Sequence, residues 1–164
     1  MTVYFHAATV QLRPGSVIDP GNYGRMLRFY RNDGSNQGWK LATEMAFEAH
    51  RASSFPALPS RLDACFAFVD LASAIAGKPR LGGDWNLLYE VEMADEGAST
   101  HIGDFDLISR CYASNPHDGF MQTVQDAAQS YWRGRPGIAI RELLTSSGLR
   151  VIRRIGWPPT PVTH

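Results

Sequence analysis

A histidine near the N-terminus lies in a narrow apolar segment that leaves room beside its ring. His6 stands in the run VYFHAATV, after two aromatic residues and before Ala7 and Ala8. β-Branched and aromatic residues in such a run predict a buried strand over residues 3–10. A lone histidine in a strand is usually a hydrogen-bonded core residue, but the small side chains that follow also leave space for a ligand. Both interpretations stand at this point.

A single carboxylate, Glu142, begins an apolar segment near the C-terminus. The stretch IAIRELLTSSGLRVIRRI predicts strands over residues 138–144 and 149–155, joined as a hairpin. A fixed carboxylate can stabilise the oxocarbenium-like cation that forms when a bond at the anomeric carbon of a sugar breaks. The alternative is an ordinary acid at a strand edge, paired with Arg141 or Arg153.

Two phenylalanines are candidates for a flat surface against which a ligand could stack. Phe66 and Phe68 lie in the segment ACFAFV, whose alternation of aromatic and small residues predicts a strand over residues 64–69. Aromatic rings stack on planar groups. Because alternation buries one face of a strand, at least one of these rings is expected in the core, and Phe66 is the candidate for a pocket.

These segments, taken in order, resemble the ADP-ribosyltransferase superfamily. The run YFHAATVQLRPGSVIDPGNYGR resembles the opening of the small bacterial rifampicin-modifying type. The segment around Glu142 resembles the end of the poly(ADP-ribose) polymerase type, in which the catalytic Glu begins a strand. In the superfamily the first strand carries His-Gly-Thr or a near variant; here Ala7 replaces the glycine and Thr9 stands one place late. Phe66 or Phe68 occupies the place of the usual nicotinamide-stacking tyrosine.

The resemblance implies an NAD-dependent mono-ADP-ribosyltransferase that cleaves nicotinamide from NAD and transfers ADP-ribose to an acceptor. It implies that His6, beside Ala7 and Thr9, holds the ribose on the nicotinamide side. Phe66 would stack on nicotinamide, and Glu142 would stabilise the cation. NAD is expected as a substrate, with no metal. The acceptor is a protein, a nucleic acid or a small molecule, and the expected setting is a bacterial toxin, effector or phage-related modifier.

Further residues are candidates for the rest of the site. Arg25 and Arg61 are expected to contact the pyrophosphate of the cofactor, because forked guanidinium groups suit a pyrophosphate. Phe68 is also expected to contact the cofactor. In the rifampicin-modifying type an aspartate has the catalytic role that the glutamate has in the poly(ADP-ribose) polymerase type. The acidic segment GDFDL therefore makes Asp104 and Asp106 the alternative acids.

A tryptophan and an arginine, Trp132 and Arg133, end a predicted helix shortly before Glu142. In ADP-ribosyltransferases the loop before the catalytic acid recognises the acceptor, so the resemblance makes both residues candidates for acceptor contact. Trp132 is equally a candidate for a core anchor of its helix.

Other functions are alternatives to the transferase. An NAD glycohydrolase would use water in place of the acceptor. A non-catalytic binding module that kept the fold would fit the missing tyrosine. Basic residues outnumber acidic ones in residues 1–61 and 119–164, which also allows an RNA-binding or RNA 2′-phosphate-transferring relative.

The elements that must position these residues indicate an α+β domain. Apolar residues at helical spacing predict helices over residues 39–52 and 122–132, and Asp70 is placed to N-cap a short helix over residues 71–76. Strands with inserted helices indicate a largely antiparallel sheet. The resemblance implies a split β-sandwich of the ADP-ribosyltransferase type.

Length and composition indicate one domain. The chain has 164 residues, of which 44% are apolar, so a single core is expected over residues 1–156, followed by an extended tail over residues 157–164. No run of apolar residues is long enough to span a membrane, and no signal sequence is evident. Location in the bacterial cytoplasm, or delivery into another cell without a classical signal, is expected.

Charge is unevenly spread along the chain. The net charge is zero, but residues 62–118 carry ten acidic and three basic groups, and both flanking thirds are basic. This pattern would allow separate cationic and anionic faces.

Overall fold

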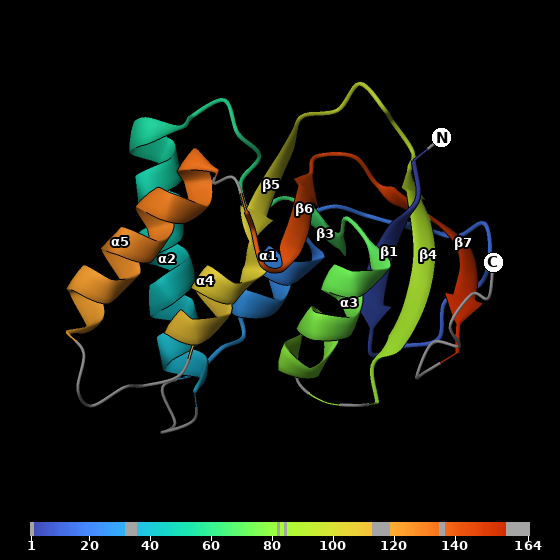
Figure 1. Cartoon of the computed structure of the whole chain (residues 1–164), viewed down its shortest axis with the longest axis horizontal. Coiled ribbons are helices and arrows are strands. Elements are labelled where there is room, and N and C mark those ends of the chain that lie inside the picture. The colour runs from blue at the N-terminus through green and yellow to red at the C-terminus, as the bar shows by residue number, and fades with distance from the viewer. Residues whose placement is uncertain are drawn as a thin grey trace.

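The computed structural model describes residues 2–31, 36–81, 83, 85–112, 119–134 and 137–156, and the tail predicted over residues 157–164 lies outside them. Within this part of the chain, one sheet contains β1 (Tyr4–Ala8), β2 (Val17–Ile18), β3 (Cys65–Phe68), β4 (Leu87–Met93), β5 (Thr100–Asp104), β6 (Arg141–Thr145) and β7 (Leu149–Ile155). The helices are α1 (Asn22–Leu27), α2 (Gln37–Ser54), α3 (Leu71–Gly77), α4 (Phe105–Cys111) and α5 (Phe120–Arg133), with a 3₁₀ turn at Lys78–Leu81. The predicted α+β class with an antiparallel sheet is confirmed (Figure 1).

The sheet has two parts that meet at a weak junction. Its strand order is β2-β7-β4-β1-β3-β6-β5, and all neighbouring strands are antiparallel. β1 pairs with β4 along its whole length, whereas its register with β3 consists of the pair Phe5–Phe68. Side chains from both parts form one buried cluster: Cys65, Ala67, Tyr89, Val91, Leu143, Leu149 and Val151. The two parts therefore share a core while hydrogen bonds still join them as one sheet.

Helices α2, α4 and α5 lie together on one side of the molecule, next to β5 and β6 (Figure 1). They contribute to the larger apolar cluster, in which Phe47 of α2 and Trp132 of α5 are buried. The Trp132 indole N–H donates to the Phe47 carbonyl over 2.8 Å, which satisfies the polar group of this buried ring. Helix α3 lies over β1 and β3, close to the junction between the two parts of the sheet.

Helix signals in the sequence are reliable where a cap or a long periodic segment is present. The carboxylate of Asp70 accepts from the Ser73 backbone N–H over 2.7 Å and N-caps α3, as predicted. The helices predicted over residues 39–52 and 122–132 are confirmed as α2 and α5, each slightly longer than expected.

The predicted hairpin between the last two strands is wrong. β6 pairs with β3 and β5, whereas β7 pairs with β4 and β2. The chain between them crosses from one part of the sheet to the other, and there the Ser147 hydroxyl oxygen accepts from the Asp95 N–H over 2.9 Å. Alternating apolar residues identify a strand but not its partner, so the short connection suggested a hairpin that tertiary packing overrides.

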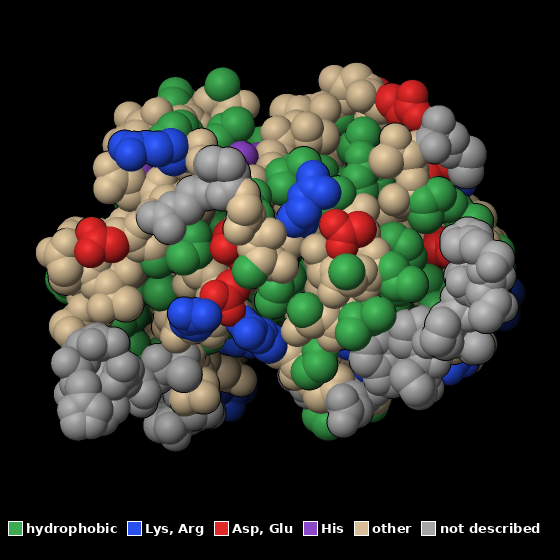
Figure 2. Space-filling view, viewed as in Figure 1, with side chains coloured by type: hydrophobic (Ala, Val, Ile, Leu, Met, Phe, Trp, Pro, Cys, Tyr) green, Lys and Arg blue, Asp and Glu red, His purple; other side chains and the backbone are tan. Residues whose placement is uncertain are grey.

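The acidic and basic segments do not form separate patches on the face shown in Figure 2, where basic and acidic side chains are interspersed. The reason is visible in the sheet, where basic β7 lies beside acidic β4: Arg150 contacts Glu92 at 3.2 Å and Arg153 contacts Glu90 at 2.6 Å. Charges far apart in the sequence thus pair across strands, so the charge blocks of the sequence do not determine the surface field.

Candidate functional site

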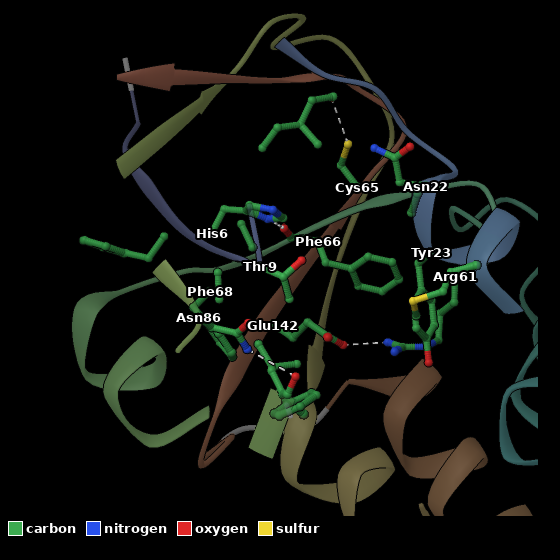
Figure 3. Close-up of a pocket in the computed structure, with 18 of the residues that line it drawn as sticks. His6, Thr9, Asn22, Tyr23, Arg61, Cys65, Phe66, Phe68, Asn86 and Glu142 are labelled. Atoms are coloured by element: carbon green, nitrogen blue, oxygen red, sulfur yellow. Dashed lines mark hydrogen bonds and ion pairs between the residues drawn. The ribbon is translucent and has the colours of Figure 1, made fainter. Parts of the chain in front are cut away.

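A cavity of about 280 Å³ lies at the junction between β1 and β3. Side chains from β1, β3, β6 and the turn before β3 converge on it (Figure 3). The residues of its lining that the sequence singled out are His6, Ala7, Thr9, Arg61, Phe66, Phe68 and Glu142. Segments that are far apart in the chain therefore meet around one space.

His6 connects the two strands beside this cavity. Its Nδ1 donates to the Phe66 carbonyl over 2.7 Å, next to the pair at which β1 and β3 are in register. Because a carbonyl oxygen can only accept, the proton lies on Nδ1, and Nε2 keeps a lone pair. Burial lowers the pKa of His6 more than this hydrogen bond raises it. The ring is therefore neutral near pH 7, and Nε2 can accept a hydrogen bond from a ligand.

Glu142 lies on β6 between β3 and β5, and 5% of its surface is exposed. Its Oε2 accepts from the Tyr131 hydroxyl over 2.7 Å and from Arg61 Nη1 over 2.6 Å. Oε1 forms no hydrogen bond with any described residue. One carboxylate oxygen is thus fixed in position, and the other is available to a ligand (Figure 3).

Arg61 joins Glu142 to a second buried carboxylate, Glu44 of α2. Arg61 Nε donates to Glu44 Oε2 over 2.9 Å. The hydroxyls of Tyr112 and Tyr23 also donate to Glu44, over 2.5 and 3.0 Å. Burial alone would lower the pKa of Arg61, but the carboxylates of Glu142 and Glu44 outweigh it and hold that pKa well above its usual value. One cation between two carboxylates gives this buried cluster a formal net charge of minus one.

A glycine on β5 makes room for the tyrosine that holds Glu142. Gly103 lies opposite Glu142 in the register, and a Cβ at this position would lie 2.3 Å from ring atoms of Tyr131. The absence of a side chain lets the ring pass close to the β5 backbone and brings its hydroxyl to the carboxylate. Burial raises the pKa of Tyr131 well above its usual value, so the hydroxyl keeps its proton and donates it to the hydrogen bond.

Phe66 and Phe68 lie on the same side of β3, because residues two apart on a strand share a face. Phe68 is buried and meets Phe105 edge-on with a centroid distance of 5.8 Å, whereas Phe66 is half-buried. The guanidinium of Arg61 lies 4.8 Å from the Phe66 ring centroid, and Tyr23 meets that ring edge-on. Position along the strand, and not alternation, therefore makes Phe66 the accessible ring.

The two arginines predicted to bind a pyrophosphate, Arg25 and Arg61, bond to other side chains of the protein. Arg25 donates to the Asn22 side chain and is absent from the cavity lining. Arg61 lines the cavity, but both buried carboxylates hold its guanidinium. The lining contains another basic residue, Lys40, whose ammonium lies 5.1 Å from the centre of the Tyr112 ring. Lys40 is thus a better candidate than either arginine for a phosphate group.

The alternative acids, Asp104 and Asp106, have structural roles and do not line the cavity. Asp104 N-caps α4 by accepting from the Asp106 N–H over 3.0 Å. Asp106 forms ion pairs with Arg80 and Arg110. Burial would raise the pKa of Asp106, but the hydrogen bond from Arg80 and the charge of Arg110 lower it. The closeness of these two acids in the sequence is explained by the start of α4.

The predicted acceptor contact through Trp132 is also corrected. Trp132 is 1% exposed and bonded to Phe47, so it is a core residue that an acceptor does not reach. Arg133 is exposed at the end of α5 but does not line the cavity. Residues 135 and 136 of the predicted acceptor loop lie outside the described residues.

The side chains that complete the cluster around Arg61 were not among the candidates from the sequence. Glu44, Tyr112 and Tyr131 bond to Arg61, and Tyr23 bonds to Glu44. Glu44 and Phe47 are three positions apart and share a face of α2, so an acid beside a large apolar residue was an available signal, although it does not reveal the partner of that acid. The tyrosines belong to no motif, and their convergence depends on the packing of α1, α4 and α5.

Fold and cavity together define an α+β domain with a ligand-sized pocket built around a buried Arg–Glu cluster. Residues 16–156 match the family described as "Protein of unknown function (DUF2441)", and the chain belongs to this family. The match begins after the strand that carries His6 and includes Glu44, Arg61 and Glu142. No curated protein matches the chain.

Metal-binding and membrane-spanning features are absent from the part of the chain that the structure describes. No three His, Cys, Asp or Glu side chains there gather as a metal site would require. No helix in the same ranges has the length and apolar character needed to cross a bilayer.

Proposed function

We propose that this protein binds NAD in the cavity, cleaves the bond between nicotinamide and ribose, and transfers ADP-ribose to an acceptor. The observation that carries the proposal is the convergence of His6, Phe66 and Glu142 on one cavity from β1, β3 and β6. The sequence resemblance assigns to these residues ribose binding, ring stacking and stabilisation of a cation. Their meeting in space supports those roles, because nothing in their sequence separation requires it.

The size of the cavity supports binding of one half of a dinucleotide. A volume of about 280 Å³ lies just below the range of small-molecule sites, which is about 300–1,000 Å³. This volume suits nicotinamide and its ribose, with the pyrophosphate and adenosine extending toward the mouth. Lys40 would then supply a positive charge for the pyrophosphate.

The charge of the buried cluster suits the bond cleavage. When the C1′–N bond breaks, both electrons leave with nicotinamide, and the positive charge moves from the nicotinamide ring to the ribose. Glu142 Oε1 would face the ribose, and the net negative charge of the cluster would stabilise the positive charge as it moves onto that ribose. A nucleophilic group of the acceptor then attacks C1′ and loses its proton to solvent.

Transfer of an RNA 2′-phosphate would need several free basic side chains around His6, and the cavity supports it less well. Of the three basic residues in the described lining, Arg61 and Arg80 are held by carboxylates, which leaves Lys40 for a phosphate. In the cell, the protein would be a bacterial modifier of a macromolecule or a small molecule. It would act in the cytoplasm, or in another cell as a toxin, effector or phage-related protein.

Incubation with NAD labelled in its adenylate half, with and without a bacterial lysate, tests the proposal. Label attached to macromolecules or to a small acceptor supports transfer, and free ADP-ribose alone supports the glycohydrolase alternative. Unchanged NAD contradicts both enzymes and favours a non-catalytic binding module. The matched control is Glu142→Gln, which keeps the side-chain size and removes the charge.

A further inference from the structure

A buried amide lines the same cavity and has an unused acceptor. Asn86, directly before β4, is 4% exposed, and its Oδ1 has no hydrogen-bond partner among the described residues. Its Nδ2 donates to the Leu81 carbonyl over 3.2 Å (Figure 3). Because a carbonyl oxygen only accepts, this bond fixes which end of the amide is nitrogen. The oxygen is therefore the end without a partner.

Because Asn86 lines the cavity, its unpaired acceptor indicates a donor that arrives with a ligand. Folded proteins pair almost all buried polar atoms, because an unpaired one costs about as much free energy as a lost hydrogen bond. Continuing the β1–β4 register beyond Ala8–Leu87 puts Asn86 opposite Thr9, which also lines the cavity. The carboxylate of Glu142 cannot supply the missing partner while it is ionised, because its oxygens then only accept.

We propose that Asn86 Oδ1 accepts a hydrogen bond from a neutral N–H or O–H group of the bound ligand and so selects ligands that carry one. This inference rests on the proposed function, in which the ligand is NAD. The donor is then either the carboxamide N–H of nicotinamide or a hydroxyl of the adjacent ribose. A ligand with a carboxylate at the same place would leave Oδ1 unpaired and would meet repulsion from the net negative cluster around Glu142.

Calorimetric titration of wild type, Asn86→Leu and Asn86→Asp with NAD and with nicotinic acid adenine dinucleotide tests the inference. Leucine removes the acceptor at similar size, whereas aspartate keeps an acceptor and loses the donor to Leu81. We expect Asn86→Leu to weaken NAD binding about five- to tenfold and Asn86→Asp to weaken it less. Thermal melting of each variant measures the separate effect of losing the Leu81 bond on stability.

The second dinucleotide, which has a carboxylate in place of the carboxamide, identifies the donor. A loss of affinity in Asn86→Leu that is confined to NAD assigns the carboxamide, and an equal loss for both dinucleotides assigns the ribose hydroxyl. Unchanged NAD affinity in Asn86→Leu, or an equal loss in both variants, overturns the inference while NAD binding by the wild type stands. Failure of the wild type to bind NAD overturns the inference together with the proposed function.

Discussion

At the scale of single residues, the account depends most on Glu142. Its Oε2 is held by Tyr131 and Arg61, so the side chain is fixed before any ligand binds. We expect Glu142→Gln to slow release of nicotinamide from NAD by a factor on the order of 10² to 10³, because the charge acts on a cation present in the transition state. NAD affinity should stay within a few-fold of wild type. Rates of nicotinamide release and calorimetric titration measure the two effects.

A matched substitution, Asp104→Asn, controls for loss of a carboxylate elsewhere. Asparagine is also a good N-cap residue, so α4 and the activity should both be retained. An active Glu142→Gln beside an inactive Asp104→Asn would transfer the catalytic role to the acidic segment. Full activity in both variants would remove the enzymatic account.

At the scale of elements, the contact between Gly103 of β5 and Tyr131 of α5 positions Glu142. In Gly103→Ala the new methyl would meet the Tyr131 ring at 2.3 Å. We expect a loss of about 1–3 kcal/mol in the free energy of unfolding, as for other overpacked cores. Nicotinamide release should also slow, because the displaced ring no longer holds Glu142. Urea unfolding and the same activity assay provide the measurements.

Gly119→Ala is the comparison for this effect. Gly119 directly precedes α5, has a negative φ of −66°, and a Cβ there would have no neighbour within 4 Å. Gly119 is also the N-cap of α5, where alanine is less favourable than glycine, so this variant should keep wild-type activity and lose less stability than Gly103→Ala. If Gly103→Ala behaves like Gly119→Ala, the close packing of Tyr131 on β5 has no part in positioning Glu142.

The same scale shows what a sequence can and cannot predict. The N-cap by Asp70 and the strand over Leu149–Ile155 follow from local patterns, and both are where the sequence predicts them. The partner of that strand was mispredicted, because pairing with β4 is decided by packing across the chain. For the site, His6 and Glu142 could be found through their segments. Glu44 could not be assigned, because its role exists only where α2 meets Arg61.

At the scale of the whole molecule, two half-buried histidines, His6 and His101, connect stability to pH. Burial lowers the pKa of His6 and of His101 below the usual 6.5. The unfolded chain therefore binds protons at these sites in a range where the folded chain does not. Above about pH 6.5 both histidines are neutral in the folded and the unfolded chain, so they do not reduce the free energy of unfolding. This free energy should decrease as the pH falls from about 6.5 toward the folded-state pKa values.

Urea midpoints at about pH 7.5 and about pH 5.5 measure this dependence in the wild type and in His6→Asn. The amide nitrogen of asparagine occupies nearly the position of histidine Nδ1, so its N–H can replace the donor to the Phe66 carbonyl, and the amide has no proton to gain in this range. The variant should therefore lose less stability than wild type over the same pH interval. An identical decrease in both proteins would show that His6 does not contribute.

The central claim is that the cavity around His6, Phe66 and Glu142 accepts the nicotinamide half of NAD. Calorimetric titration of the full chain with NAD, and in parallel with ATP, tests it most directly. ATP shares the adenosine and phosphates of NAD but has no nicotinamide riboside to enter the cavity. The account predicts saturable binding of NAD at one site per chain and no saturable binding of ATP. Saturable binding of ATP with none of NAD would contradict it.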